Sequence, residues 1–279
     1  MLPEFPHFPV ADSTSFSSGV TMRNANTGSS YFHSFNVRFE KRMSQGLQVV
    51  GTYGWSKLLE RDSWLNNTDT IPEKRISPFD RPQRFVTAVN YDLPVGRGKL
   101  INVQSGLWDR IFGGWRLNGI YTYQVGAPIQ WMNGSTNNPG DYPLCRVSTV
   151  NGLCPSGSEA TGLTTSALNL NNRGVDGKAF DTTHFVTASS GQYQFHLRTM
   201  QTTFGDLRAD GQNNLDMSIL KRVQITEGSY FQFRFEAFNI LNHVSFGVPN
   251  AQVTSSAFGT ITTQANRPRQ IQLGFRFVF

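Results

Sequence analysis

The chain ends with Gln270-Ile271-Gln272-Leu273-Gly274-Phe275-Arg276-Phe277-Val278-Phe279. Apolar side chains recur at every second position from Ile271 to Phe279, separated mainly by glutamine, glycine and arginine. Because successive side chains of a β-strand point to opposite faces, this segment predicts a strand with one apolar and one polar face. A soluble β-protein buries such an apolar face in a sandwich, whereas a membrane β-barrel turns it toward lipid and keeps the polar face in a watery lumen.

The composition favours the membrane alternative. The mean hydropathy is -0.35, and no apolar run approaches the roughly 20 residues of a membrane helix. That pattern excludes helical spans, but barrel strands alternate and average out to polar. The 279 residues include 22 phenylalanines and 26 glycines, and only 16% are charged, which suits strands and turns better than a soluble surface.

The formal net charge of +6 does not indicate nucleic-acid binding. The basic residues are spread along alternating segments and form no run. A lumen lined with arginine, or contact with anionic lipid headgroups, explains the excess equally well. We therefore expect outer-membrane lipid as a partner and no nucleic acid.

The same period-two alternation recurs along the chain and predicts about seven strands. A short amphipathic helix is predicted within 101–112. The predicted strands are 31–42, 47–58, 85–91, 115–124, 213–222, 230–240 and 270–279.

Short and long connections alternate between these strands. Tight turns at 43–46 and 226–228 contrast with long polar segments at 60–84, 127–212 and 242–268. Outer-membrane barrels have short periplasmic turns and long external loops. The predicted fold is therefore all-β, an antiparallel up-and-down transmembrane barrel segment in the cell outer membrane, with 127–212 as a long extracellular loop.

About seven strands are too few for a closed barrel. Bacterial barrels use an even number, at least eight, and hydrocarbon does not tolerate open sheet edges. The first residues also lack the features of a secretory signal. We therefore interpret residues 1–30 as the remnant of an extracellular loop and 31–279 as the C-terminal part of a larger barrel.

The polar faces of the predicted strands carry charged residues that would point into the lumen. Their alternative role is structural, as ion pairs between neighbours in the wall, and we favour that role for any single residue. The lumen-facing candidates are Arg38, Arg42, Arg116, Arg234, Glu236 and Arg276.

Cys145 and Cys154 lie close together in a segment rich in glycine, proline and serine. One local disulfide fits an oxidising compartment, and two free thiols are the alternative. A metal site is disfavoured because neither cysteine has further ligands at suitable spacing. No catalytic spacing of serine, histidine and aspartate is found either, so we predict no enzyme, no cofactor and no metal.

Four segments resemble TonB-dependent outer-membrane receptors, and most closely the Oar-like branch, whose members carry an N-terminal carboxypeptidase-regulatory-like domain. The likeness covers about residues 30–279 and is weakest between 130 and 200. The segments are Phe233-Arg234-Phe235-Glu236-Ala237-Phe238-Asn239-Ile240-Leu241-Asn242-His243 with Phe246-Gly247-Val248-Pro249, then 77–85, 114–128 and 267–277.

This resemblance implies a barrel of about 22 strands closed by an N-terminal plug, which takes up a scarce large solute with energy from the TonB complex. It also implies that Phe275, Phe277 and Phe279 form the signal that the barrel-assembly machinery reads. The chain corresponds to the C-terminal part of such a barrel, without plug, TonB-contacting segment or early strands. Contact with TonB would therefore pass through a plug outside this sequence, and the solute stays unknown.

Two other classes of protein also fit the sequence. One is a non-transporting surface or adhesion barrel whose loop around Cys145 and Cys154 meets a partner. The other is a soluble secreted β-sandwich that binds carbohydrate, which would refold without detergent.

Overall fold

The computed structural model describes residues 27–65, 69–130, 178–179, 202–252 and 255–279. Within them, one large antiparallel sheet has the order β1-β2-β4-β5-β8-β9-β10, and the short strand β3 pairs with β2 off this path. The predicted all-β antiparallel fold and its long strands are thus confirmed. The long strands are β1 Ser29–Ser44, β2 Leu47–Arg61, β4 Gln83–Asp92, β5 Trp115–Gln124, β8 Gln212–Gln224, β9 Tyr230–Phe238 and β10 Gln270–Val278.

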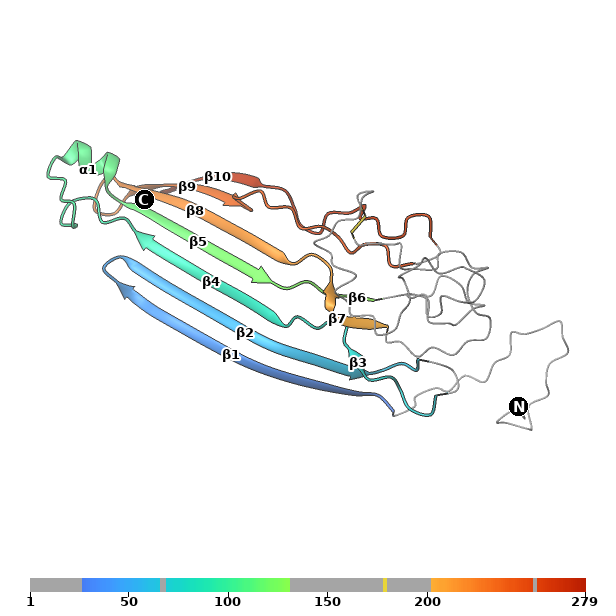
Figure 1. Ribbon diagram of the computed structural model, residues 1–279. Helices are drawn as coiled ribbons and strands as arrows, with labels where there is room; N and C mark the ends of the chain where they lie inside the picture. Colours follow the sequence, from blue (N-terminus) through green and yellow to red (C-terminus); the bar gives the residue numbers. More distant parts are fainter. Residues whose placement is uncertain (1–26, 66–68, 131–177, 180–201, 253–254) are drawn as a thin grey trace, which may run out of the picture.

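Each long strand pairs with the next long strand along the chain, so the sheet is an up-and-down meander. The β1–β2 turn and the C-terminus lie at one end of the sheet, and the short strands β3, β6 and β7 lie at the other (Figure 1). We call these the turn end and the loop end. The helix α1, Gly106–Phe112, confirms the predicted amphipathic helix in a shorter form and lies at the turn end.

The segment 127–212 is not irregular throughout, which corrects the prediction of one long loop. It contains β6, Pro128–Gln130, and β7, Thr203–Arg208, which form a separate two-stranded sheet. The short β3, Arg75–Ile76, was also missed. Runs of two to six residues carry too little alternation to be recognised.

The register gives the sheet two uniform faces. Directly opposite residues of an antiparallel pair share a face, and odd-numbered residues pair with odd-numbered ones in one row after another. One such row runs Val37–Tyr53–Phe85–Tyr123 across four strands. The odd positions of the long strands therefore form one apolar face, and the even positions form a polar face. The single register shift, between Lys41 and Ser44, lies beside the β1–β2 turn.

The apolar face is exposed. Phe35 and Phe275 keep 61% and 62% of their surface accessible, and Leu273 keeps 78%. Among the described residues, the buried apolar side chains are few: Ile129, Ala179, Ala237 and Phe258. Large exposed apolar surfaces mark contacts with a partner or a membrane. The apolar face of this sheet therefore contacts an apolar environment that the described chain does not provide.

The β1–β2 turn shows why the strands reverse tightly at this end. Gln45 and Gly46 both have positive φ, 53° and 82°, as the two-residue turns that match strand twist require. A Cβ at Gly46 would lie 2.7 Å from the carbonyl oxygen of Asp92. Glycine is thus required there by both conformation and space.

No helix in the described part of the chain has the length and apolar character needed to cross a membrane.

Candidate functional site

The polar face carries a continuous row of polar side chains across six strands, at Gln48, Asn90, Asn118, Ser218, Glu236 and Gln272. Neighbours in this row bond to each other. The Nδ2 of Asn90 donates to the Oε1 of Gln48 at 3.2 Å, and the Nδ2 of Asn118 donates to Ser218 Oγ at 3.0 Å. Two of the neighbouring pairs in the row are thus hydrogen-bonded, and the row presents a hydrophilic surface.

The register places Arg38, Arg116, Arg234, Glu236 and Arg276 together on this polar face. It does not place Arg42, which lies in the irregular pairing between Lys41 and Ser44. The sequence pattern therefore identified a shared face for all these candidates except Arg42.

Most of these charges bond to neighbours in the sheet. Arg38 pairs with Glu40 at 3.2 Å, and Arg234 pairs with Glu236 at 3.5 Å. Arg116 meets Asp92 on the adjacent strand through two hydrogen bonds. Exposed pairs of this kind contribute about 0–1 kcal/mol each, so they fix the local geometry of the wall more than its stability.

Unlike Arg38, Arg116 and Arg234, the candidate Arg276 has no ion pair among the described residues. It lines a depression of about 240 Å³ on the polar face together with Gln232, Arg234, Glu236 and Gln272. The guanidinium of Arg276 thus adds a positive charge without an ion pair in the described chain to this depression.

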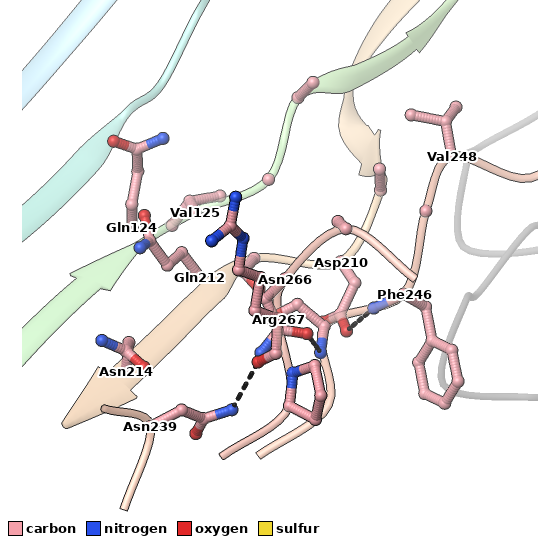
Figure 2. A pocket seen from close by; sticks show the side chains of 18 of the residues that line it. Gln124, Val125, Asp210, Gln212, Asn214, Asn239, Phe246, Val248, Asn266 and Arg267 are labelled. Carbon is pink, nitrogen blue, oxygen red and sulfur yellow. Dashed lines mark hydrogen bonds between the residues drawn. The ribbon is translucent and has the colours of Figure 1, made fainter. Parts of the chain in front are cut away.

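A larger cavity of about 740 Å³ lies at the loop end of the same face. Even-numbered residues of four strands contribute to its lining: Gln124, Gln212, Asn214, Asp216, Phe238 and Gln270. Loop residues complete it, among them Arg81, Phe246, Val248 and Arg267, and Figure 2 shows how polar side chains from separate segments converge there.

One wall of this cavity is fixed by Asn239, which follows β9 and is 5% exposed. Its Nδ2 donates to the carbonyl oxygen of Arg267 at 3.1 Å (Figure 2). The same Nδ2 donates to the carbonyl oxygen of His243 at 2.9 Å, and the Oδ1 accepts from the N–H of His243. Its own N–H donates to Asp216 Oδ1 at 2.8 Å. Asn239 has φ 49°, a conformation that asparagine tolerates better than most residues.

A second set of bonds joins the β9–β10 connection to the corner before β8. The N–H of Phe246 donates to Asp210 Oδ2 at 2.9 Å, and Ser245 Oγ donates to the carbonyl oxygen of Gly211 at 3.0 Å (Figure 2). Asn266 Oδ1 accepts from the N–H of Ser245. Together with Asn239, these contacts hold the connection as a built wall of the cavity.

The lining is rich in amides, and three of them have free side chains. No hydrogen bond joins the side chains of Gln124, Gln212 and Gln270 to the rest of the described chain. Amides donate and accept at once, so these groups can bind hydroxyl, amide or carboxylate groups of a ligand.

Behind the cavity, a buried ion pair ties the β3–β4 connection to β7. Asp80 is 2% exposed, and its Oδ2 lies 2.6 Å from Arg208 Nη2, while its Oδ1 accepts from the N–H of Leu58 at 2.7 Å. Arg208 also donates to the carbonyl oxygens of Asp80, Gly126 and Gly205. Nothing in the sequence pattern indicates this pair, because its two residues are 128 positions apart.

Arg81 sits between this pair and the cavity. Burial, followed by the nearby charge of Arg208, lowers its pKa from the ordinary value, and Asp80 acts in the opposite direction. Its Nη1 donates to the carbonyl oxygens of Pro78 and Asp80 at 3.0 and 2.9 Å, so Arg81 forms a fixed, positively charged part of the cavity wall.

The predicted assembly signal lies at the turn end. Phe275 and Phe277 are on the apolar face, where both pack against Phe231 with ring centroids 5.3 and 4.7 Å apart. Phe279 follows β10, contacts Phe277 and is 95% exposed. The structure thus gives these residues a common aromatic surface, and their role in assembly stays a prediction.

Other sequence expectations fall outside the described residues or find no support in them. Cys145 and Cys154 lie outside the described ranges, so their disulfide stays a prediction. No group of three or more histidine, cysteine, aspartate or glutamate side chains within the described ranges could hold a metal ion.

A meander with an exposed apolar face and a hydrogen-bonded polar face is the wall of a transmembrane β-barrel. Comparison with known protein families agrees: the family described as outer membrane beta barrel domain matches residues 7–272. The chain therefore belongs to this family, and its location is the cell outer membrane. A comparison with curated proteins found no match.

Proposed function

We propose that this chain is the C-terminal part of the barrel of a TonB-dependent receptor of the Oar-like branch. In this role the chain forms part of the barrel wall and the cavity at the loop end, and both take part in the uptake of a large solute. The observation that carries the proposal is the direction and openness of its sheet.

In an up-and-down meander of seven long strands, the first and the last run in the same direction. β1 and β10 each have one strand neighbour within the described chain. Direct closure would join them in parallel, so a fully antiparallel barrel needs an odd number of additional strands between them. Copies of this chain in the same membrane orientation meet the same parallel mismatch at every junction between them.

The sheet is also open. Figure 1 shows β1 and β10 at opposite edges, with the whole sheet between them. Seven strands of a small eight-stranded barrel would nearly close on themselves, whereas in a barrel of about 22 strands they form a shallow arc. The separation of β1 and β10 in Figure 1 favours a wide barrel, the size at which outer-membrane transporters enclose a plug.

The cavity supports solute binding rather than a passive wall. It lies on the polar face at the loop end, where a barrel receives solute from outside, and it combines free amides with Arg81 and Arg267. A large polar solute would find both donors and acceptors there. The resemblance to TonB-dependent receptors implies that the TonB complex supplies the energy for uptake.

The test is uptake by cells that carry the full reading frame containing this chain. Deleting that gene and inactivating TonB should abolish uptake of the same solute in a screen of labelled nutrients. Loss of surface attachment with uptake unchanged would instead favour an adhesion barrel and contradict the proposal.

A further inference from the structure

We propose that α1 and the segment before it form a membrane-interface anchor. In this arrangement α1 lies in the headgroup–acyl boundary of the phospholipid leaflet that the short turns reach, which is the periplasmic one in outer-membrane barrels. The proposal concerns a lipid contact and is independent of what the barrel transports.

α1 has an apolar side that nothing in the described chain covers. Leu107, Trp108, Ile111 and Phe112 are spaced so that they share one side of a helix. Leu107 is 67% exposed and Trp108 is 52% exposed, and the rings of Trp108 and Phe112 stack at 5.7 Å. Such a cluster in water would be a liability, whereas in a lipid interface it is a binding surface.

The helix is fixed to the side of the sheet that faces lipid. Lys221 and Trp115 are odd-numbered, directly opposite residues of the apolar face. The Nε1 of Trp115 donates to the carbonyl oxygen of Ile111 at 3.0 Å, and Lys221 Nζ donates to the carbonyl oxygens of Ile111 and Gly113. A lysine on a face of phenylalanine and leucine is costly unless paired, and here the C-terminal carbonyls of α1 pair it.

The segment before the helix is held in the same way. Val95 and Ile101 form an isolated parallel bridge, and Asp109 Oδ1 accepts from the N–H of Arg97 at 2.7 Å. Leu100 and Ile101 are both exposed, so this segment adds apolar surface to the same β4–β5 connection. The β4–β5 connection is thus attached to the sheet through Trp115 and Lys221, and it keeps exposed apolar side chains.

Continuity with the membrane-facing surface identifies the occupant. The apolar face of the sheet lies in the outer membrane, because the chain is an outer-membrane barrel domain. α1 continues that face beyond the strand ends (Figure 1). Arg97, Lys99 and Arg110 accompany the apolar cluster, as expected for contact with anionic headgroups. A phospholipid leaflet is therefore the partner that fits both the apolar cluster and the basic side chains.

The experiment places an environment-sensitive fluorescent amino acid at single positions of the full-length protein in vesicles of phosphatidylethanolamine and phosphatidylglycerol. Leu107 and Ile111 probe the apolar side of α1, and Arg110 is the matched control on its other side. Leu273 on β10 reports the apolar face of the sheet. Quenching by lipids spin-labelled at different depths is compared with quenching by aqueous iodide.

The anchor predicts that probes at Leu107 and Ile111 are quenched severalfold more by lipid labels about 5–10 Å below the headgroups than the probe at Arg110. Iodide should quench the probe at Arg110 and leave the other two shielded. Equal iodide quenching at Leu107, Ile111 and Arg110, with Leu273 shielded, overturns the anchor alone. Iodide quenching at Leu273 as well overturns the lipid-facing assignment together with the anchor.

Discussion

The buried pair of Asp80 and Arg208 offers the sharpest test of how the loop end is held. Replacing Asp80 with alanine removes the carboxylate that, in the described part of the chain, pairs with Arg208, whose side chain is 13% exposed. It also removes the acceptor for the N–H of Leu58. Breaking a buried pair from one side typically costs about 3–5 kcal/mol.

The low end of that range applies here, because Arg208 keeps carbonyl acceptors at Gly126 and Gly205. We therefore expect Asp80→Ala to destabilise the local structure by about 3 kcal/mol. If the amides of this region exchange through local opening, their protection should fall roughly a hundredfold. The distant β4–β5 pairing, for example at Val89, should keep its protection.

The assay is amide hydrogen exchange on the purified protein, followed by mass spectrometry of peptides that contain Leu58 and β7. Asp80→Asn is the matched control, because it keeps an oxygen for Leu58 while removing the charge, and it should fall between wild type and Asp80→Ala. Adding Arg208→Met to Asp80→Ala should restore part of the protection, since no buried charge is then left alone. Unchanged exchange in Asp80→Ala, or a double variant as damaged as the sum of the two single variants, would refute this reasoning.

Three further outcomes are expected. Asn239→Ala removes several side-chain bonds of the cavity wall and should lower local stability by about 2–3 kcal/mol, seen as faster proteolysis of the β9–β10 connection; resistance equal to wild type would contradict it. Gly46→Ala meets positive φ and a close carbonyl, so the fraction that refolds in detergent should drop, whereas Gly228→Ala, with open space around it, should fold normally. Ile219→Arg puts a charge on the apolar face and should cost about 2–4 kcal/mol near the bilayer centre, whereas Ser218→Arg on the polar face should cost little, as measured by urea unfolding from vesicles.

The strands were predictable because alternation reports directly on which side chains share a face. Within each strand, alternation separates an apolar from a polar face without any long-range information. The register, which pairs odd with odd positions, then puts Phe35, Phe85 and Phe233 on a single surface. The face of Arg42 could not be predicted, because a register shift beside the turn interrupts the alternation.

The loop end was not predictable, because its contacts join residues far apart in sequence through backbone groups. Asp80 and Arg208 are 128 positions apart, and alternation says nothing about such a pair. The asparagines of the cavity wall gave a weak signal, since asparagine favours turns and bonds to nearby backbone. It did not reveal that Asn239 and Asn266 would both bond to His243.

Odd-numbered residues of these strands face lipid, and even-numbered ones face water. A probe of lipid and aqueous exposure placed in turn at Met217, Ser218, Ile219 and Leu220 on β8 of the vesicle-embedded protein tests this arrangement. We expect strict alternation, with lipid quenching at 217 and 219 and iodide quenching at 218 and 220. Uniform exposure, or shielding of the odd positions by protein in a water-soluble form, would contradict it.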